Sequence, residues 1–376
     1  MENLSINYGM DSALPGIKDV QLNPLCLDTL DVKTLKGRPR VIVTNEPFSP
    51  VSDDVSVKYI EPPSFSKLRR IFSRISPAKA LLDRIAALTV AVRLVSEMRR
   101  GDAVGLFSLG SRSGFIFCFL NSFKCFRGGP VFIYRVFLPM NAGRLKIYLM
   151  GRVLRNVALI AVWSRAQIEN YYQTFGWPRD RFVFIPYKAN HSSRGAAVPM
   201  PVGDYIFSGG NSERDYKTLF EAVRGLSIPV IVSTTKPAAT RGLEVPENVI
   251  LVGTEKQAFE RLMAGSRMVA LCLQKEMIRG SGEATMLNAM WQGKPVIIAD
   301  NISAADYMSD GIDGFIVPAG SAEQMRRRIL ELWEDPKRAA RMGEAGRAKV
   351  AAFYTHQQWK NRMRALAMLV FDRERA

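Results

Sequence analysis

The chain has 376 residues, which is long for one hydrophobic core and suits two domains of about 150–200 residues each. Hydrophobic residues make up 47% of the sequence, so a large core can be buried and wholesale disorder is excluded. The formal net charge of +17 calls for an anionic partner, such as nucleic acid, anionic lipid or a phosphorylated small molecule.

The four cysteines show no CxxC motif and no paired spacing, which fits a reducing compartment and argues against a zinc site. The two histidines are too few for a histidine-based metal centre. The N-terminal residues do not form a signal peptide, and the longest apolar runs are far below the ~18 residues that cross a bilayer. We therefore expect a cytoplasmic protein without a metal, either soluble or peripheral on the inner face of the plasma membrane.

The first half of the chain alternates short apolar runs with helical patterns, which favours a parallel sheet. The run 40–44 ends at Asn45 and Glu46, which are weak candidates for an acceptor site because ligands bind at the carboxyl ends of such strands. The glycine- and hydroxyl-rich loop 110–114 follows a second strand and suits an anion or a sugar. Arg135 lies in the strand 130–137, where a buried arginine is costly unless paired, so it is either exposed at the strand end or functional.

Residues 65–100 hold nine lysines and arginines but only two acids, with apolar residues at helical spacing between them. One interpretation is a basic amphipathic surface that lies on anionic lipid. The other is a solvated helical face whose apolar side packs on the domain core. The sequence leaves both open.

After a polar linker at 187–203, the strand–helix pattern starts again. The strand 204–208 leads into a glycine loop at 209–215, which is a phosphate-loop candidate with Arg214 and Lys217 available as counter-charges. A second candidate begins at residue 279, where two glycines lie just before a helical segment, 283–292. Unpaired amides and the helix dipole at such an N-terminus suit a phosphate.

The helix of this second candidate adds polar groups to the same place. Ser281 and Thr285 supply hydroxyl donors, and Thr285 shares a helix face with Asn288 because they are three residues apart. An ordinary loop–helix–strand unit with a glycine-rich connection is the alternative interpretation.

Four runs, at residues 207–219, 282–297, 310–320 and 335–343, resemble the nucleotide-sugar-binding domain of retaining glycosyltransferases of the GT-B fold, and in particular glycosyltransferase family 4, the glycosyl transferases group 1. The first half resembles the family's acceptor domain more loosely, through residues 160–165 and 182–186. The resemblance implies an α/β protein of two facing Rossmann-like domains, with parallel sheets flanked by helices.

The resemblance also sets the expected domain boundaries. Residues 1–200 would form the acceptor domain and residues 201–355 the nucleotide-sugar-binding domain. Residues 356–376 would form a C-terminal helix that packs back towards the N-terminal domain.

Carried over position by position, the resemblance implies that the loop after residue 208 lines the diphosphate, that the loop at 280–283 holds phosphates and sugar, and that residue 288 meets the ribose. The implied donor-binding residues are Gly209, Gly210, Asn211, Gly253, Arg279, Gly280, Ser281, Gly282, Thr285 and Asn288. The implied catalytic residues are Arg214, Lys217, Glu283 and Arg135.

This chain departs from the family at two glutamates that are usually separated by seven residues. The two positions are Gly280 and Asn288 here. Asn288 can still hydrogen-bond a hydroxyl, and Glu276 and Glu283 are close enough in sequence to substitute for the first glutamate. The family commonly has a histidine near the end of the strand in which this chain has Arg135.

The resemblance implies a retaining, metal-independent hexosyltransferase without a cofactor, in which basic groups and amide donors stabilise the leaving diphosphate. The donor would be a UDP- or GDP-sugar and the acceptor a glycan or lipid-linked glycan, in bacterial polysaccharide or envelope synthesis. The departures leave a second hypothesis, a catalytically weakened binder of sugar nucleotides or glycans. A nucleic-acid partner is not expected, because the charges are spread over the pattern and no recognition motif occurs.

Overall fold

The structure is a computed structural model of the chain. It describes residues 27–28, 41–44, 56–61, 63, 76–99, 103–108, 112–123, 131–135, 143–154, 157–190, 203–275 and 280–373. Two compact units emerge from the contacts along the backbone. The first comprises Met1–Val136, Tyr148–Ile160 and Asn361–Ala376, and the second comprises Phe137–Ile147 and Ala161–Lys360.

The first sheet has six strands in the order β2-β1-β3-β4-β5-β6. The strand–helix alternation of the first half is therefore confirmed, and the pairs from β2 through to β5 are parallel. The strands are β1 Val41–Thr44, β2 Ser56–Tyr59, β3 Ala103–Ser108, β4 Val131–Arg135, β5 Leu159–Val162 and β6 Phe182–Phe184. The helices are α3 Ser76–Met98, α4 Arg112–Asn121, α5 Arg144–Val153 and α6 Arg165–Phe175, and a short 3-10 turn, η4, spans Arg179–Arg181.

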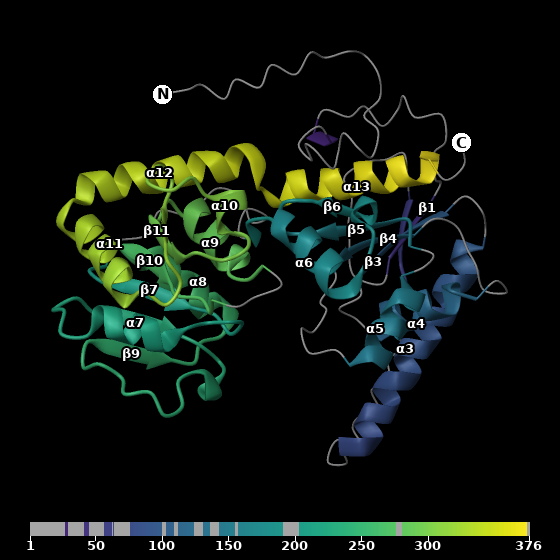
Figure 1. The fold of residues 1–376 in the computed structure, drawn as a ribbon, viewed down its shortest axis with the longest axis horizontal. Coiled ribbons are helices and arrows are strands. Elements are labelled where there is room, and N and C mark those ends of the chain that lie inside the picture. Colours follow the sequence, from purple (N-terminus) through teal and green to yellow (C-terminus); the bar gives the residue numbers. More distant parts are fainter. Residues whose placement is uncertain are drawn as a thin grey trace, which may run out of the picture. The chain divides into compact units, whose positions relative to one another are not determined.

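The second sheet lies wholly in the second unit and is parallel throughout, in the order β12-β11-β10-β7-β8-β9 (Figure 1). Its strands are β7 Ile206–Gly209, β8 Val230–Ser233, β9 Val249–Val252, β10 Met268–Leu271, β11 Val296–Ala299 and β12 Phe315–Val317. The strand order reverses between β7 and β10, and in open α/β sheets ligands bind outside the carboxyl ends of the strands at such a point.

The helices that follow the second sheet's strands continue to the described end of the chain. They are α7 Tyr216–Val223, α8 Lys256–Gly265, α9 Glu283–Trp291, α10 Ala304–Tyr307, α11 Ala322–Glu334, α12 Pro336–Phe353 and α13 His356–Arg373, with a 3-10 turn, η6, at Pro237–Ala239. Asp215, Ser321 and Asp335 each accept a backbone N–H in the first turn of the helix that follows, which defines the starts of α7, α11 and α12.

Alternating side chains of the second sheet build two separate cores. Ile206, Met268 and Ile297 face the core that includes α7 and α11. Their neighbours Phe207, Val269 and Ile298 face the opposite core, which includes α8, α9 and α10. The period of two along each strand therefore covers both faces of the sheet, as a parallel sheet requires.

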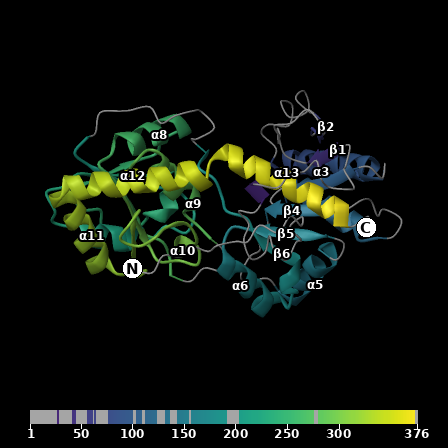
Figure 2. The same ribbon diagram turned by 90° about the horizontal axis from the view of Figure 1, so that it is seen from above.

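Helix α12 packs closely on α9 (Figure 2). Gly343 permits this approach, because a Cβ there would lie 2.1 Å from the carbonyl oxygen of Gly293. The same contact positions the C-terminal end of α9, whose N-terminal end faces the candidate site described below.

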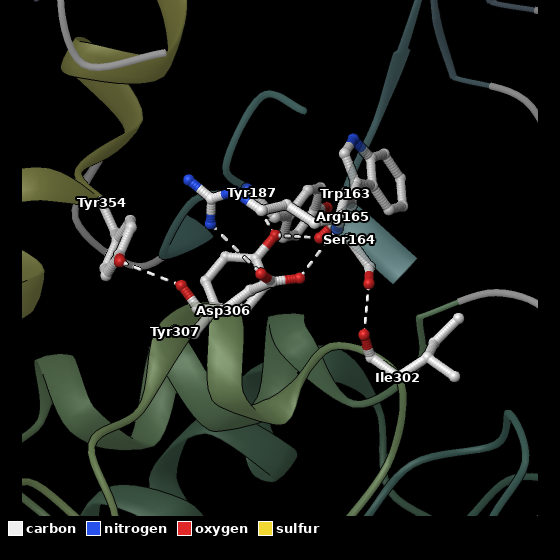
Figure 3. A network of polar contacts seen from close by, with 8 residues as sticks. All are labelled: Trp163, Ser164, Arg165, Tyr187, Ile302, Asp306, Tyr307 and Tyr354. Carbon is white, nitrogen blue, oxygen red and sulfur yellow. Dashed lines mark hydrogen bonds and ion pairs between the residues drawn. The ribbon is translucent and has the colours of Figure 1, made fainter. Parts of the chain in front are cut away.

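A buried tyrosine connects distant segments within the second unit (Figure 3). The hydroxyl of Tyr307 in α10 donates to the carbonyl of Trp163 at 2.6 Å and accepts the backbone N–H of Tyr187 at 2.9 Å. Nearby, Asp306 accepts the backbone N–H of Arg165 at 2.9 Å and pairs with its guanidinium at 3.2 Å. Burial raises the pKa of Tyr307 well above its usual value, so the hydroxyl stays protonated and remains a donor.

Around this tyrosine the same segments are joined twice more. The hydroxyl of Ser164 donates to the carbonyl of Ile302, and the hydroxyl of Tyr354 approaches the carbonyl of Asp306 at 3.4 Å (Figure 3). Residues 163–165 and 187 are thereby fixed to α10 and the turn that precedes it.

We predict that Tyr307→Phe lowers the free energy of unfolding by about 1–3 kcal/mol, because it removes two hydrogen bonds in a buried position. Tyr354→Phe is the matched control, since the hydrogen bond from its hydroxyl to the carbonyl of Asp306 is at the long limit, and it should cost less than about 1 kcal/mol. Chemical denaturation of the two variants measures the difference. Equal losses would contradict the role given to the Tyr307 hydroxyl.

His356, at the start of α13, is held neutral by its surroundings. Burial is the largest of the causes that lower its pKa from 6.5 to about 4, and the charges of Lys188 and Lys360 contribute to the same shift. The ammonium of Lys188 is itself fixed over the ring of Trp359, 3.2 Å from the ring centroid.

This depressed pKa predicts a specific acid sensitivity. Between about pH 6.5 and pH 4 the unfolded chain binds a proton at His356 that the folded chain does not, so the folded state loses stability as the pH falls through this window. His356→Gln should therefore lose less stability than the wild type between pH 6.5 and pH 4, measured by denaturation at each pH. Parallel curves for the two proteins would refute this assignment.

Candidate functional site

A cavity of about 230 Å³ opens at the carboxyl ends of β7, β8 and β9 in the second unit. It lies beside the point where the strand order reverses, and the first turns of α8 and α9 close two of its sides. The residues that line it are Asn190, Gly210, Asn211, Ser233, Thr234, Thr235, Thr254, Lys256, Phe259, Glu260, Ala284, Thr285 and Asn288.

The loop after β7 is shaped by a buried arginine. Arg214 donates from Nε to the carbonyl of Gly209 at 2.9 Å and from Nη1 to the carbonyl of Ser212 at 2.9 Å, so the loop wraps around its guanidinium. Gly210 has a φ of +124°, and a Cβ there would lie 2.4 Å from Nη2 of Arg214. Only glycine fits at residue 210 for both reasons.

Two side-chain contacts join this loop to the start of α9. Arg214 donates from Nη2 to the hydroxyl of Thr285 at 3.1 Å, and Ser281 donates to the carbonyl of Ser212 at 3.1 Å. Gly282 precedes the helix with a φ of +93°, which turns the chain into α9. The two glycine loops predicted separately from the sequence therefore form one structure.

The electrostatics of this structure favour an anion. Burial lowers the pKa of Arg214, while the nearby Tyr216 and Glu283 oppose that shift. An arginine stays protonated in proteins despite such a shift, so a positive charge is held beneath the loop. The N-terminus of α9 adds the positive end of its dipole at the same place.

Glu283 occupies the space that a side chain at residue 280 would fill. A Cβ on Gly280 would lie 1.8 Å from Oε1 of Glu283, so the buried carboxyl group of Glu283 lies directly against the backbone of residue 280. Of the two acids that lie near residue 280 in the sequence, Glu283 is the one that the structure describes beside it. Glu276 lies outside the described residues.

Hydroxyl and amide groups form the wall on the β8 side. Asn211 donates to the hydroxyl of Thr235 at 2.7 Å and accepts from the hydroxyl of Thr234 at 2.9 Å. Ser233 and Thr254 share a hydrogen bond of 2.5 Å. These groups lie after the ends of three adjacent strands and give the cavity a polar rim suited to hydroxyl-bearing ligands.

An aromatic side chain forms another wall. Phe259 of α8 packs edge-on against Phe207, with ring centroids 5.1 Å apart. Gly209 leaves room for it, because a Cβ at residue 209 would lie 2.5 Å from the Phe259 ring. Gly209 does not itself line the cavity, and its contribution is the space that it leaves for the ring of Phe259.

Most sequence-predicted site residues are brought together here. Gly210, Asn211, Thr285 and Asn288 line the cavity, and Arg214 and Ser281 lie directly behind them. The sequence analysis missed Thr234, Thr235, Thr254, Phe259 and Asn190. The threonines carried a usable signal, since they follow the apolar runs that form β8 and β9.

Other predicted residues are not brought to the cavity. Lys217 has a side chain that is 72% exposed and pairs with Glu221 one turn further along α7, so it does not counter the charge of a ligand in the cavity. Gly253 precedes Thr254 without lining the cavity. Arg135 ends β4 opposite Ser108, its side chain lies outside the described part, and Arg279, Asn45 and Glu46 lie outside it altogether.

Neither a metal cluster nor a bilayer-spanning helix occurs in the part of the chain that the structure describes. No group of three or more histidine, cysteine, aspartate or glutamate side chains there could hold an ion. No helix there has the length and hydropathy to cross a membrane.

Comparison with known proteins finds one family match over part of the chain and several proteins of similar structure. Residues 236–349 match the family of glycosyl transferases group 1. The whole chain is similar in structure to sucrose-phosphate synthase from Thermosynechococcus elongatus, with 14% identity, a TM-score of 0.59, and coverage of 85% of this chain and 86% of that one. A search among curated protein sequences finds no match.

Two further structures support the same fold. Anabaena HepE in complex with UDP-glucose has 14% identity and a TM-score of 0.59, and the match covers 87% of this chain and 98% of that one. A glycosyltransferase from Rickettsia africae has 13% identity and a TM-score of 0.56, with 82% and 83% covered. At 13–14% identity these likenesses show that the chain shares the fold of GT-B glycosyltransferases.

We predict that Arg214→Ala lowers the free energy of unfolding by at least about 2 kcal/mol, because three acceptors, two of them in buried hydrogen bonds, lose a charged donor together. The control is Lys217, three residues after Arg214 in the sequence. Lys217→Ala also removes a positive charge, but from an exposed ion pair, so it should change the free energy of unfolding by less than about 0.5 kcal/mol. Denaturant titration compares the two variants. Similar small losses for both would show that Arg214 does not hold the loop.

Proposed function

We propose that this protein transfers a sugar from a UDP- or GDP-sugar, with retention and without a metal, to a glycan or lipid-linked acceptor in bacterial polysaccharide or envelope synthesis. One observation carries the proposal: Arg214 hydrogen-bonds to both glycine loops and so joins them. They meet beside a cavity at the point where the strand order of the sheet reverses. This arrangement has an anion-binding end and a hydroxyl-binding end, which are the two needs of a nucleotide sugar.

The diphosphate belongs at the first turn of α9. Backbone amides there have no partner within the helix, and Ser281 and Thr285 add hydroxyl groups at the same end. Arg214 lies behind Thr285 with its charge buried, where the low local dielectric strengthens its attraction for a leaving diphosphate.

The nucleoside belongs at the rim formed after β8 and β9. Asn288 projects into the cavity one turn along α9 from Thr285, so it reaches the ribose hydroxyls when the phosphates lie at the helix start. The threonines at residues 234, 235 and 254 and the ring of Phe259 bound the remaining space for a base. Similarity to the UDP-glucose complex of HepE supports a nucleotide sugar as the ligand class.

Glu283 is assigned to the donor sugar. Its carboxyl group lies against Gly280 at the start of α9, next to the position of the phosphates and therefore of the sugar attached to them. A carboxylate at this point accepts hydrogen bonds from sugar hydroxyls and orients the anomeric carbon.

The reaction follows from these placements. The bond between the anomeric carbon and the diphosphate oxygen breaks, and the diphosphate leaves with the electron pair. The acceptor oxygen bonds to the same face of the sugar, and its proton passes to the leaving diphosphate oxygen. The α9 amides, the Ser281 and Thr285 hydroxyls and Arg214 stabilise the charge that develops on the leaving group.

A thermal-shift panel with UDP, GDP, ADP and a short DNA duplex tests the donor site. One nucleoside diphosphate should raise the unfolding midpoint by several degrees, since a ligand at 100 times its dissociation constant stabilises by about 2.7 kcal/mol. The nucleobase of the diphosphate that raises the midpoint would also identify the nucleotide of the donor sugar. A shift with DNA and none with any nucleotide would overturn the proposal.

A transfer assay with the sugar nucleotide that is identified in this way tests the chemistry. Glu283→Gln should keep binding of the nucleoside diphosphate within about threefold and reduce turnover at least about tenfold, a loss of 1.4 kcal/mol or more in the transition state. Nucleotide binding without transfer or donor hydrolysis in the wild type would instead favour the binding protein that the Gly280 and Asn288 departures suggest.

We place this activity on the cytoplasmic side of the membrane, where nucleotide sugars are the donors and a lipid-linked acceptor would be reached from the surface. The placement rests on the proposed substrates.

A further inference from the structure

Helix α3 carries an exposed apolar stripe. Leu81, Ile85, Leu88 and Val92 are 57%, 43%, 49% and 53% exposed, although large aliphatic side chains are usually buried. Figure 1 shows α3 running past the end of α4, its neighbour in the first unit. An apolar surface of this kind calls for an occupant.

The four side chains share one face of the helix. With about 100° per residue, positions 81, 85, 88 and 92 fall within an arc of about 60° and extend over about 17 Å of helix. Between them lie buried residues such as Leu82, Ala86 and Val90, which attach the other side of α3 to the core of the first unit. The helix is thus apolar towards both the core and the solvent.

The charges of α3 are arranged around this stripe. Arg84 is exposed on its border, and the exposed Arg99 lies in line with it just beyond the end of the helix. The two acids of α3, Asp83 and Glu97, lie about 150–180° away from the stripe. Glu97 is also neutralised by Lys58, 2.6 Å away.

The sequence that precedes α3 is also positively charged. Lys67, Arg69, Arg70 and Arg74 precede the helix within ten residues of its start, without an intervening acid. Positive charge at Arg84 and Arg99 beside an apolar stripe matches the interface of an anionic bilayer, which offers negative headgroups over acyl chains.

We propose that α3 docks this protein on an anionic lipid bilayer, with the stripe formed by Leu81, Ile85, Leu88 and Val92 entering the acyl boundary and the arginines contacting lipid phosphates. A second copy of the chain fits less well, because pairing two stripes would bring two positively charged borders together. The helix lies in the interface plane, as its charged border requires.

Vesicle co-sedimentation tests the assignment, using phosphatidylcholine alone and phosphatidylcholine with one third phosphatidylglycerol. The wild type should bind the anionic vesicles at least about tenfold more tightly than the neutral ones, because the arginines contribute only where headgroups are charged. The double variant Ile85→Gln with Leu88→Gln should lose at least about tenfold in affinity for the anionic vesicles.

The matched control is Ile250→Gln with Leu251→Gln on β9. These two side chains are also one isoleucine and one leucine, 55% and 40% exposed, but they belong to the second unit. The control should bind vesicles as the wild type does. Both double variants should keep the thermal shift with nucleotide, which separates a failure of docking from a failure of the proposed function or of folding.

A charge variant completes the test. Arg84→Gln with Arg99→Gln should lose binding to anionic vesicles several-fold and flatten its dependence on salt, while binding to neutral vesicles stays unchanged. Equal vesicle binding by the wild type and the Ile85, Leu88 variant would overturn the proposal. So would a concentration-dependent dimer that the same variant abolishes, since a second copy would then cover the stripe.

Discussion

The buried guanidinium of Arg214 is the interaction on which the candidate site depends. It joins the carbonyls of Gly209 and Ser212 to the hydroxyl of Thr285, so two loops 71 residues apart become one surface. A buried charge is stable only when its donors are satisfied, which constrains the loop to wrap around it and residue 210 to be glycine. The same constraint directs positive charge and a helix N-terminus towards one cavity.

The second sheet explains why the cavity lies where it does. All its strands run parallel, so their carboxyl ends meet at one edge, and the order reverses between β7 and β10. The loop after β7 and the segment after β10 must therefore diverge around a crevice. Packing sets the finer shape: Gly343 allows α12 to approach α9, and Gly209 leaves room for Phe259.

Arginines of the described part of the chain occur in two kinds of environment. Arg214 is buried and held by hydrogen bonds, which suits a compact diphosphate. Arg84 is exposed on α3 beside an apolar stripe, which suits an extended anionic surface. A buried cation orients a ligand and an exposed one attracts it over a longer range, so these groups serve different partners.

The sequence by itself determined the α/β alternation, the two glycine loops and the resemblance to glycosyl transferases group 1, because strand and helix periodicity and glycine requirements are local properties. It also indicated Arg214, Thr285 and Asn288. Only the tertiary structure decided that Lys217 points to solvent, that Glu283 fills the space beside Gly280, and that Phe259 walls the cavity. Those outcomes depend on which segments pack together, and burial between distant segments leaves no mark in the local sequence pattern.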